Sequence, residues 1–346
     1  MPYSNDLTII DIAKLSGVSI STVSRILNGR EEVAPATRAR VQRIIDEVGY
    51  QPHAQAQHLR ARRAMMIALL YPPPTQTDYV MTQFVLDFMI GASQRAGQNR
   101  YLFSFITQPL DPSSLLNLYR SGQIDGAILM QVRLQDWRVD LLRHEDYPFV
   151  LIGRCADNDG ISYIDLDFEA AVLSAYDKLV ELGHQQIGLI TFPRRTHDEE
   201  YGPAVRSIQG FEAACAKHGL TPILYEAEFG MEPMFAALEC LARQYPDLTA
   251  IVTSHSESIS AILQAADALG LQIPHDLSVI APLEDTLAER STPPLTTIDF
   301  PSYDMGQQGV DMLLHKLEHP QAAPQQILIA PRLVMRESVR AHKPLS

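Results

Sequence analysis

The 346-residue sequence lacks the features of a membrane or exported protein. No apolar run approaches the ~18 residues that a membrane-spanning helix needs, and the N-terminus has no basic segment followed by an apolar stretch. We therefore expect a protein that contacts no membrane and stays in the cytoplasm. Hydrophobic residues at 46% and charged residues at 20% are typical of a globular chain with a large core.

Catalytic and metal-binding motifs are also scarce. The 3 cysteines, Cys155, Cys215 and Cys240, are far apart and odd in number, so we expect buried free thiols. The sequence contains no HExxH metal motif, nucleophile elbow, phosphate loop or dinucleotide fingerprint. It therefore predicts no enzyme, no cofactor and no metal site.

Residues 8–28 have the pattern of two short helices separated by a turn. Thr8 and Asp11 have the spacing of a capping box, which predicts a helix through Leu15. Gly17 supplies the turn, and Ser19 can cap a second helix. The apolar seam between these helices consists of Ile12, Ala13, Val23, Ile26 and Leu27.

The exposed face of the second helix carries small hydroxyl groups and one arginine. It consists of Ile20, Ser21, Thr22, Ser24 and Arg25. Such a helix is slim enough to enter the major groove of DNA and has donors in its N-terminal turn. An ordinary helical hairpin is the alternative interpretation.

A third helix and a hinge follow. Pro35 begins a helix that ends at Gly49, with a core face made of Val41, Ile44, Ile45 and Val48. Ala34 stands at its N-cap, where Ser would stabilise the helix by about 0.5–2 kcal/mol, so we expect a marginal headpiece over residues 1–50. We expect residues 51–63 to form a hinge helix only when this segment is paired with the same segment of a second copy and with DNA. Leu59 is a candidate wedge for the minor groove, or else it packs on the next domain.

Charge is divided unevenly along the chain. Residues 1–63 hold 9 Lys/Arg and 6 Asp/Glu, a net charge of 9 − 6 = +3, whereas the remainder holds 19 and 35, a net charge of 19 − 35 = −16. A basic head on an acidic body directs the head towards DNA and keeps the body away from it.

Residues 64–346 alternate between short apolar runs and helical patterns, which predicts a doubly wound α/β fold with two lobes. The predicted strands are Met66–Tyr71, Tyr101–Thr107, Gly126–Met130, Phe149–Gly153, Ile187–Thr191, Ala250–Thr253 and Leu277–Ala281. The predicted helices are Phe84–Ala96, Asp167–Leu182, Val205–His218, Met234–Gln244 and Glu257–Leu269.

Aromatic, arginine and carboxylate side chains follow the predicted strands. Ligands of open parallel sheets bind beyond the carboxyl ends of the strands. The candidates there include Tyr79, Phe84, Arg154, Arg206, His255 and Glu257. Aromatic rings and bidentate groups suit a hydroxyl-rich small molecule such as a sugar, although each residue could equally belong to a solvated loop or an interface.

The N-terminal motifs DIAKLSGVS, STVSRILNG, RARVQRIIDEVGYQP and AQHL resemble the headpiece and hinge of the LacI/GalR family of bacterial transcription regulators. The resemblance implies that Ile20, Ser21 and Arg25 read bases. It implies phosphate contacts from Thr8, Ser19, Thr22, Asn28 and Thr37, and hinge contacts to DNA from His53, Ala56, Gln57 and Leu59. His53, Gln57 and Ala34 depart from the usual Asn, Arg and Ser of the family.

The body is similar to the family's sensor region, which has the two-lobed fold of periplasmic sugar-binding proteins. This similarity implies a first lobe of about 64–163 and 296–325 and a second lobe of about 164–295 and 326–346. Phe84 and Phe229 carry over as pocket residues. His255-Ser256-Glu257 replaces the usual Asn-Asp-Glu, and Ser207 replaces a pocket Arg, with Arg206 displaced by one position.

The resulting hypothesis is a homodimeric repressor of carbohydrate-utilisation genes that a small sugar releases from a palindromic, double-stranded DNA operator. One alternative is a regulator that needs a corepressor. Another is a global regulator that answers to a phosphocarrier protein. The remaining alternatives are a transport binding protein and a sugar-modifying enzyme, for which the sequence offers no motif.

Overall fold

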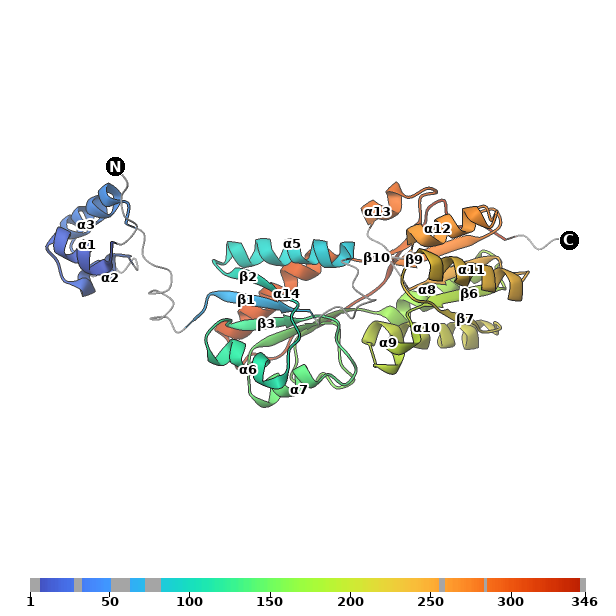
Figure 1. Ribbon diagram of the computed structural model, residues 1–346, viewed down its shortest axis with the longest axis horizontal. Helices are drawn as coiled ribbons and strands as arrows, with labels where there is room; N and C mark the ends of the chain where they lie inside the picture. The colour runs from blue at the N-terminus through green and yellow to red at the C-terminus, as the bar shows by residue number, and fades with distance from the viewer. Residues whose placement is uncertain are drawn as a thin grey trace. The chain divides into compact units, whose positions relative to one another are not determined.

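A computed structural model describes residues 7–27, 33–50, 63–71, 82–254, 259–282 and 285–342. The chain divides into two compact units, Met1–Ala64 and Met65–Ser346 (Figure 1). The expected hinge at residues 51–63 lies almost wholly outside the described residues, as do Asn28, Tyr79, His255 and Glu257.

The described residues of the N-terminal unit form the helices α1 (Ile9–Ser16), α2 (Ile20–Leu27) and α3 (Pro35–Val48). The predicted capping box is confirmed, because the Thr8 hydroxyl and N–H donate to Asp11 Oδ2 at 2.7 and 2.9 Å and the Asp11 N–H donates back to Thr8 Oγ1. Gly17 ends α1 in the left-handed conformation, with φ 63°. This conformation is favourable for glycine and lets the chain turn into α2.

The core of this unit is small. It comprises the buried residues Ile12, Ala13, Val23, Ile26, Val41, Ile45 and Tyr50. This set confirms the predicted seam, with Leu27 and Val48 packed at its border. Ala34 makes no side-chain hydrogen bond at the N-cap of α3, so the first N–H groups of that helix lack the usual partner.

The C-terminal unit contains two six-stranded sheets, which confirms the predicted two-lobed α/β architecture. The first sheet, in spatial order, is β11 (Gln326–Ile329), β5 (Tyr163–Leu166), β4 (Phe149–Ile152), β3 (Gly126–Leu129), β1 (Met66–Leu70) and β2 (Leu102–Ile106). The second is β12 (Arg332–Val334), β10 (Thr296–Asp299), β9 (Ser278–Pro282), β8 (Ala250–Thr253), β6 (Ile187–Thr191) and β7 (Ile223–Glu226). The described strands pair in parallel, except β10 with β12, which are antiparallel.

Helices cover both faces of each sheet (Figure 1). The first sheet lies between the pair α5 (Gln83–Gln98) and α14 (Ser302–Glu318) and the pair α6 (Pro112–Arg120) and α7 (Trp137–His144). The second lies between α8 (Phe168–Glu181) with α10 (Gly202–His218) and α11 (Met231–Gln244) with α12 (Ile259–Ala268). Two short helices complete this lobe, α9 (Arg194–Asp198) and α13 (Asp285–Arg290).

Three strands belong to a different lobe from the one expected from the sequence. Strands β5 and β11 belong to the first sheet and β10 to the second, so the chain crosses between lobes at the end of each of these strands and not at its beginning. The physical reason is that a strand stays paired with its own sheet along its whole length. The crossings therefore lie at the carboxyl ends of these strands, beside the loops where ligands of open sheets bind.

Glycines allow the main helix pairs to approach closely. A Cβ at Gly306 of α14 would lie 2.2 Å from the Phe88 carbonyl oxygen of α5, and one at Gly91 would lie 2.2 Å from the Tyr303 oxygen. In the second lobe, a Cβ at Gly210 of α10 would lie 2.3 Å from the Glu169 oxygen of α8. Each lobe thus contains a helix crossing in which backbone meets backbone.

Candidate functional site

The first candidate site is the N-terminal turn of α2. The Thr22 N–H donates to Ser19 Oγ at 3.1 Å, which confirms Ser19 as the cap of this helix. The Ser19 hydroxyl also lies 2.7 Å from Ser21 Oγ and 2.8 Å from Thr22 Oγ1. Hydroxyl groups and helix N–H groups therefore gather at one helix end, an arrangement that suits an anionic partner such as DNA phosphate.

The outer face of α2 is open to solvent. Ser21 and Arg25 are exposed, and Ile20 is 39% exposed although its side chain is large and apolar. Val23 and Ile26 on the opposite face are buried and hold the helix in place. This part of the unit thus presents hydroxyls, one methyl-rich side chain and one guanidinium, the groups that can read base edges in a major groove.

The two remaining described DNA-site candidates lie on other elements. Thr8 is exposed, and its hydroxyl bonds to Asp11. These bonds from Thr8 hold the pKa of the Asp11 carboxyl below its ordinary value. Thr37 lies half-buried in the first turn of α3.

The second candidate site lies between the lobes, where three charged side chains meet. Arg154 Nε donates to Asp165 Oδ2 at 3.1 Å, both from the first lobe. Arg206 of α10, in the second lobe, donates through Nη2 to the carbonyl oxygens of Arg154 and Cys155 at 3.1 and 3.2 Å. Two residues expected in the effector pocket, Arg154 and Arg206, are thus brought together by the fold.

Asp165 is a member of this cluster that the sequence analysis did not single out. Its side chain is buried in strand β5, and the residue is only 4% exposed. Burial raises the pKa of the Asp165 carboxyl to about 6, although Arg206 and Arg154 oppose this shift. A charged residue inside the otherwise apolar run Tyr163–Leu166 was the available sequence signal.

A backbone bridge accompanies the charged cluster. The Gly202 N–H donates to the Val132 oxygen at 3.1 Å, and the Leu134 N–H donates to the Glu200 oxygen at 2.8 Å. Arg133 pairs with Tyr201 as an isolated antiparallel bridge, and its guanidinium forms an ion pair with Glu199. These contacts join the loop after β3 in the first lobe to the segment before α10 in the second.

Phe84, another expected pocket residue, belongs to an aromatic row beside the lobe crossings. Its ring packs edge-on against Phe300 with centroids 5.7 Å apart, and Phe300 packs against Phe168 at 5.8 Å. Phe300 follows β10 and Phe168 begins α8, so both lie at crossings. Phe229 lies apart from this row, half-buried after the edge strand β7.

Ser207 occupies the position where the family resemblance led us to expect a pocket arginine. It is fully buried, and its Oγ has no hydrogen-bond partner within the described part of the chain. The neighbouring Arg206 extends instead towards the first lobe. From the neighbouring helix position, the Arg206 guanidinium therefore reaches the main chain of the first lobe at Arg154 and Cys155.

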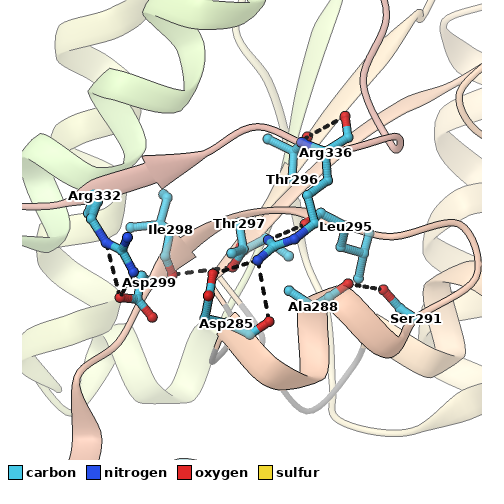
Figure 2. Close-up of polar contacts among 11 residues, drawn as sticks. Asp285, Ala288, Ser291, Leu295, Thr296, Thr297, Ile298, Asp299, Arg332 and Arg336 are labelled. Atoms are coloured by element: carbon cyan, nitrogen blue, oxygen red, sulfur yellow. Dashed lines mark hydrogen bonds and ion pairs between the residues drawn. The ribbon is translucent and has the colours of Figure 1, made fainter.

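The C-terminal segment contacts the start of α13 and the end of β10 (Figure 2). The Arg336 guanidinium donates to the Asp285 side chain and main-chain oxygen at the start of α13, and to the Leu295 oxygen at 2.9 Å. Arg332 makes an ion pair with Asp299 at 2.6 Å at the end of β10. Arg336 and Arg332 thus tie the carboxyl edge of the second sheet to strand β12.

Cysteine and histidine show structural roles. All three cysteines are free thiols, as predicted, with Cys155 and Cys215 buried, and burial raises the pKa of Cys155 to about 12. His184 is buried between Thr249 Oγ1 and the Arg340 oxygen, at 2.8 and 3.0 Å. Across the described ranges, no three His, Cys, Asp or Glu side chains gather as metal ligands.

None of the described helices combines the length and the apolar character that crossing a membrane requires.

Residues 8–53 match the family described as bacterial regulatory proteins, lacI family, and residues 176–339 match the periplasmic binding protein-like domain. The ribose operon repressor of Haemophilus influenzae is 30% identical to this chain over 97% of its length and 99% of the relative. The HTH-type transcriptional regulator CelR of Thermobifida fusca is 28% identical, over 94% and 96%.

Solved structures show the same architecture. The lac repressor dimer bound to operator and the anti-inducer ONPF superimposes with a TM-score of 0.83 at 23% identity, covering 97% of this chain and 99% of that one. The CelR–cellobiose complex gives a TM-score of 0.68 at 26% identity, covering 96% and 100%.

Headpiece, two-lobed body and relatives together define a DNA-binding transcriptional regulator. The chain belongs to the LacI family of bacterial regulatory proteins and is not an enzyme.

Proposed function

We propose that this protein is a homodimeric repressor of carbohydrate-utilisation genes, which a small sugar-like effector releases from a palindromic operator. The observation that carries the proposal is the similarity over nearly the full chain to the ribose operon repressor and to CelR, whose solved complex contains cellobiose. These relatives favour a carbohydrate effector for this chain.

The DNA contacts follow from the exposed face of α2. Ile20, Ser21 and Arg25 are proposed to read base edges, while Ser19, Thr22, Thr8 and Thr37 are proposed to bind phosphates. Asn28, His53, Ala56, Gln57 and Leu59 complete the proposed DNA-binding set from segments outside the described residues. One recognition helix reads only a few base pairs, so two copies are needed for a specific site.

An apolar surface supports dimerisation. Leu86 and Ile90 lie one turn apart on the outer side of α5 and are 41% and 49% exposed. Leu102 on the neighbouring edge strand β2 is 66% exposed. Exposed apolar side chains beside an open sheet edge favour pairing with a second copy, and two-fold symmetry matches a palindromic site.

The effector is proposed to bind between the lobes, at the carboxyl ends of the strands. Arg154, Arg206 and Phe84 lie beside the lobe crossings; Phe229, Tyr79, His255 and Glu257 complete the proposed set. A ligand that holds the lobes in one arrangement can shift the separation of the two hinges in the dimer. The coupling free energy expected for such a switch is about 1–3 kcal/mol.

A corepressor mechanism is the second candidate, because a ligand held between Arg154 and Arg206 can equally stabilise the arrangement of the lobes that binds DNA. One experiment separates the two candidates. Fluorescence anisotropy of the full chain on selected operator DNA is measured with a panel of sugars, sugar acids and sugar phosphates. Release of DNA supports the induced repressor, tighter binding supports the corepressor mechanism, and an unchanged affinity with every ligand contradicts effector control.

A further inference from the structure

In the described part of the chain, the charged cluster between the lobes has hydrogen-bond donors that meet no acceptor. Arg154 uses only Nε, on Asp165, and Arg206 uses only Nη2, on two carbonyl oxygens. Within the described ranges, the remaining guanidinium N–H groups of both residues have no acceptor. The Arg154 side chain is 22% exposed, so part of this donor set can be reached from outside the protein.

Among the described residues, the cluster also has one positive charge more than it has negative charges. Two guanidinium groups face one described carboxylate, Asp165, and Asp165 and Arg206 are buried at 4% and 7% exposure. A buried cation without a full counter-charge is costly, because it has lost its hydration without gaining an equal partner. An anion that enters this cluster would therefore complete the charge balance as well as the hydrogen bonds.

The location fits a ligand that reaches both lobes. Arg154 follows strand β4 and Asp165 lies in β5, both at the carboxyl edge of the first sheet, whereas Arg206 comes from α10 of the second lobe. A ligand group held by Arg154 and Arg206 would thus contact the two lobes at once. Arginine is well suited to this role because its planar donors match a carboxylate or a phosphate in a bidentate manner.

We infer that the effector of this protein is a sugar-sized molecule with an acidic group, a carboxylate or a phosphate, which binds between Arg154 and Arg206. The inference rests on the proposed effector-controlled regulator and narrows the class of its ligand. In this arrangement Asp165 orients Arg154 through Nε and competes with the incoming anion for the same positive charge.

The test uses the full chain and isothermal titration calorimetry with matched ligand sets. The probes are glucose, galactose and ribose, the uronic acids of the two hexoses, and the phosphates of all three sugars. We expect at least one acidic probe to bind and its neutral parent to bind at least tenfold more weakly. A carboxylate or a phosphate preference identifies which acid the cluster recognises. Binding of neutral sugars alone, or no binding of any acidic probe, overturns the inference.

Two variants test whether the acidic probe binds at this cluster. Arg154→Gln should weaken binding of the acidic probe by about tenfold to a hundredfold, the range expected for a lost charge-assisted contact. Asp165→Asn should leave binding unchanged or strengthen it, because the competing carboxylate is removed. A purely structural cluster would instead lose binding in both variants.

Arg133→Gln is the matched control, since Arg133 also contacts the other lobe but is already neutralised by Glu199. It should change the affinity for the acidic probe less than twofold. Operator anisotropy on the same samples separates two kinds of failure. Release by a neutral sugar preserves the proposed function and overturns the acidic effector, whereas an acidic probe that binds without changing operator affinity contradicts the regulatory role alone.

Discussion

The Arg206 guanidinium, in the second lobe, donates a hydrogen bond of 3.1 Å to the main-chain oxygen of Arg154 in the first. A side chain from one lobe thus binds the backbone of the other, directly after strand β4. The contact is partly buried and lies beside the ion pair of Arg154 with Asp165, so its energy depends on the arrangement of the lobes. Residues around this contact are accordingly the place to test how the lobes are held together.

Gly202 makes room for Arg206, and Gly202→Ala should disturb the contact. A Cβ at this position would lie 2.5 Å from Arg206 Nη1 and 3.3 Å from the Val132 oxygen. We expect a loss of about 1–3 kcal/mol in the free energy of unfolding, the usual range for overpacking, and faster amide exchange at Leu134. In an Arg206→Ala background most of this cost should vanish; an unchanged cost would assign it to Val132 instead.

Asp165 should make stability depend on pH. Its pKa, raised to about 6 by burial against the opposing charges of Arg206 and Arg154, lies above the ordinary value of about 3.9. The folded protein therefore binds this proton more tightly than the unfolded chain, and the contribution of Asp165 to stability is present at low pH and is lost as pH rises from about 4 to about 6. Cys155 and Tyr163 face Arg206 in the same cluster.

Urea unfolding at a series of pH values measures this effect. The difference in unfolding free energy between the wild-type protein and Asp165→Asn should fall across pH 4 to 6 and stay level above it. A constant difference would mean that Asp165 titrates at its ordinary value. Affinity for an acidic ligand should rise as pH falls through this range, because a protonated Asp165 no longer competes for Arg154.

The crossing of α5 and α14 should not tolerate a side chain at Gly306. The added Cβ would meet the Phe88 oxygen at 2.2 Å and the Ala92 nitrogen at 2.9 Å, and backbone atoms cannot move aside as a flexible side chain can. Gly306→Ala should cost at least about 1–3 kcal/mol of stability. Gly97→Ala, in α5 with no atom within 4 Å of the new Cβ, should instead be neutral or stabilising by up to about 1 kcal/mol. Thermal unfolding of both variants checks the contrast.

Arg25 should determine sequence preference on DNA. We expect Arg25→Gln to weaken operator binding by about 1–3 kcal/mol and to relax the preference at one base pair in each half-site. Arg43→Gln, which removes the same charge from the exposed side of α3, should leave the sequence preference unchanged. Competition assays with single-base operator variants measure this. A uniform loss across all sequences would assign Arg25 to a phosphate.

Ala34→Ser should stabilise α3. The N-cap has no side-chain hydrogen bond, and its extended conformation (φ −51°, ψ 135°) suits a capping hydroxyl. The gain should be about 0.5–2 kcal/mol, visible as slower amide exchange in the first turns of α3. Exchange in the two lobes of the C-terminal unit should not change. An unaltered rate in α3 would show that the hydroxyl finds no backbone N–H there.

Hydrophobic pattern predicted most of the fold, because buried parallel strands are continuous apolar runs. The predicted β1, β3, β4 and β8 agree with the structure to within one residue at each end. Strand β5 was missed because Asp165 interrupts its apolar run. Strand β10 was missed because it begins with two polar residues, Thr296 and Thr297, which are fully buried and whose hydroxyls donate to main-chain oxygens. Such strands depend on tertiary partners that no local pattern reveals.

The interlobe site was predicted in part. Arg154 and Arg206 were expected in one pocket, and the structure brings them into contact. The hydrogen bonds of Arg206 in this contact go to main-chain oxygens of the other lobe. A shift of one helix position changes the direction in which a guanidinium points. Sequence spacing alone does not determine which hydrogen-bond partners lie in that direction. Asp165 acquires its importance only from the two arginines that the fold brings beside it.

Selection of bound DNA from a random duplex library by the full chain, followed by sequencing, shows directly whether this protein reads DNA as a homodimer. A homodimeric reader with α2 in the major groove predicts an enriched inverted repeat with two equal half-sites, and Arg25→Gln should alter the same base pair in each. Enrichment of a single half-site, or of no sequence above background, would contradict the account.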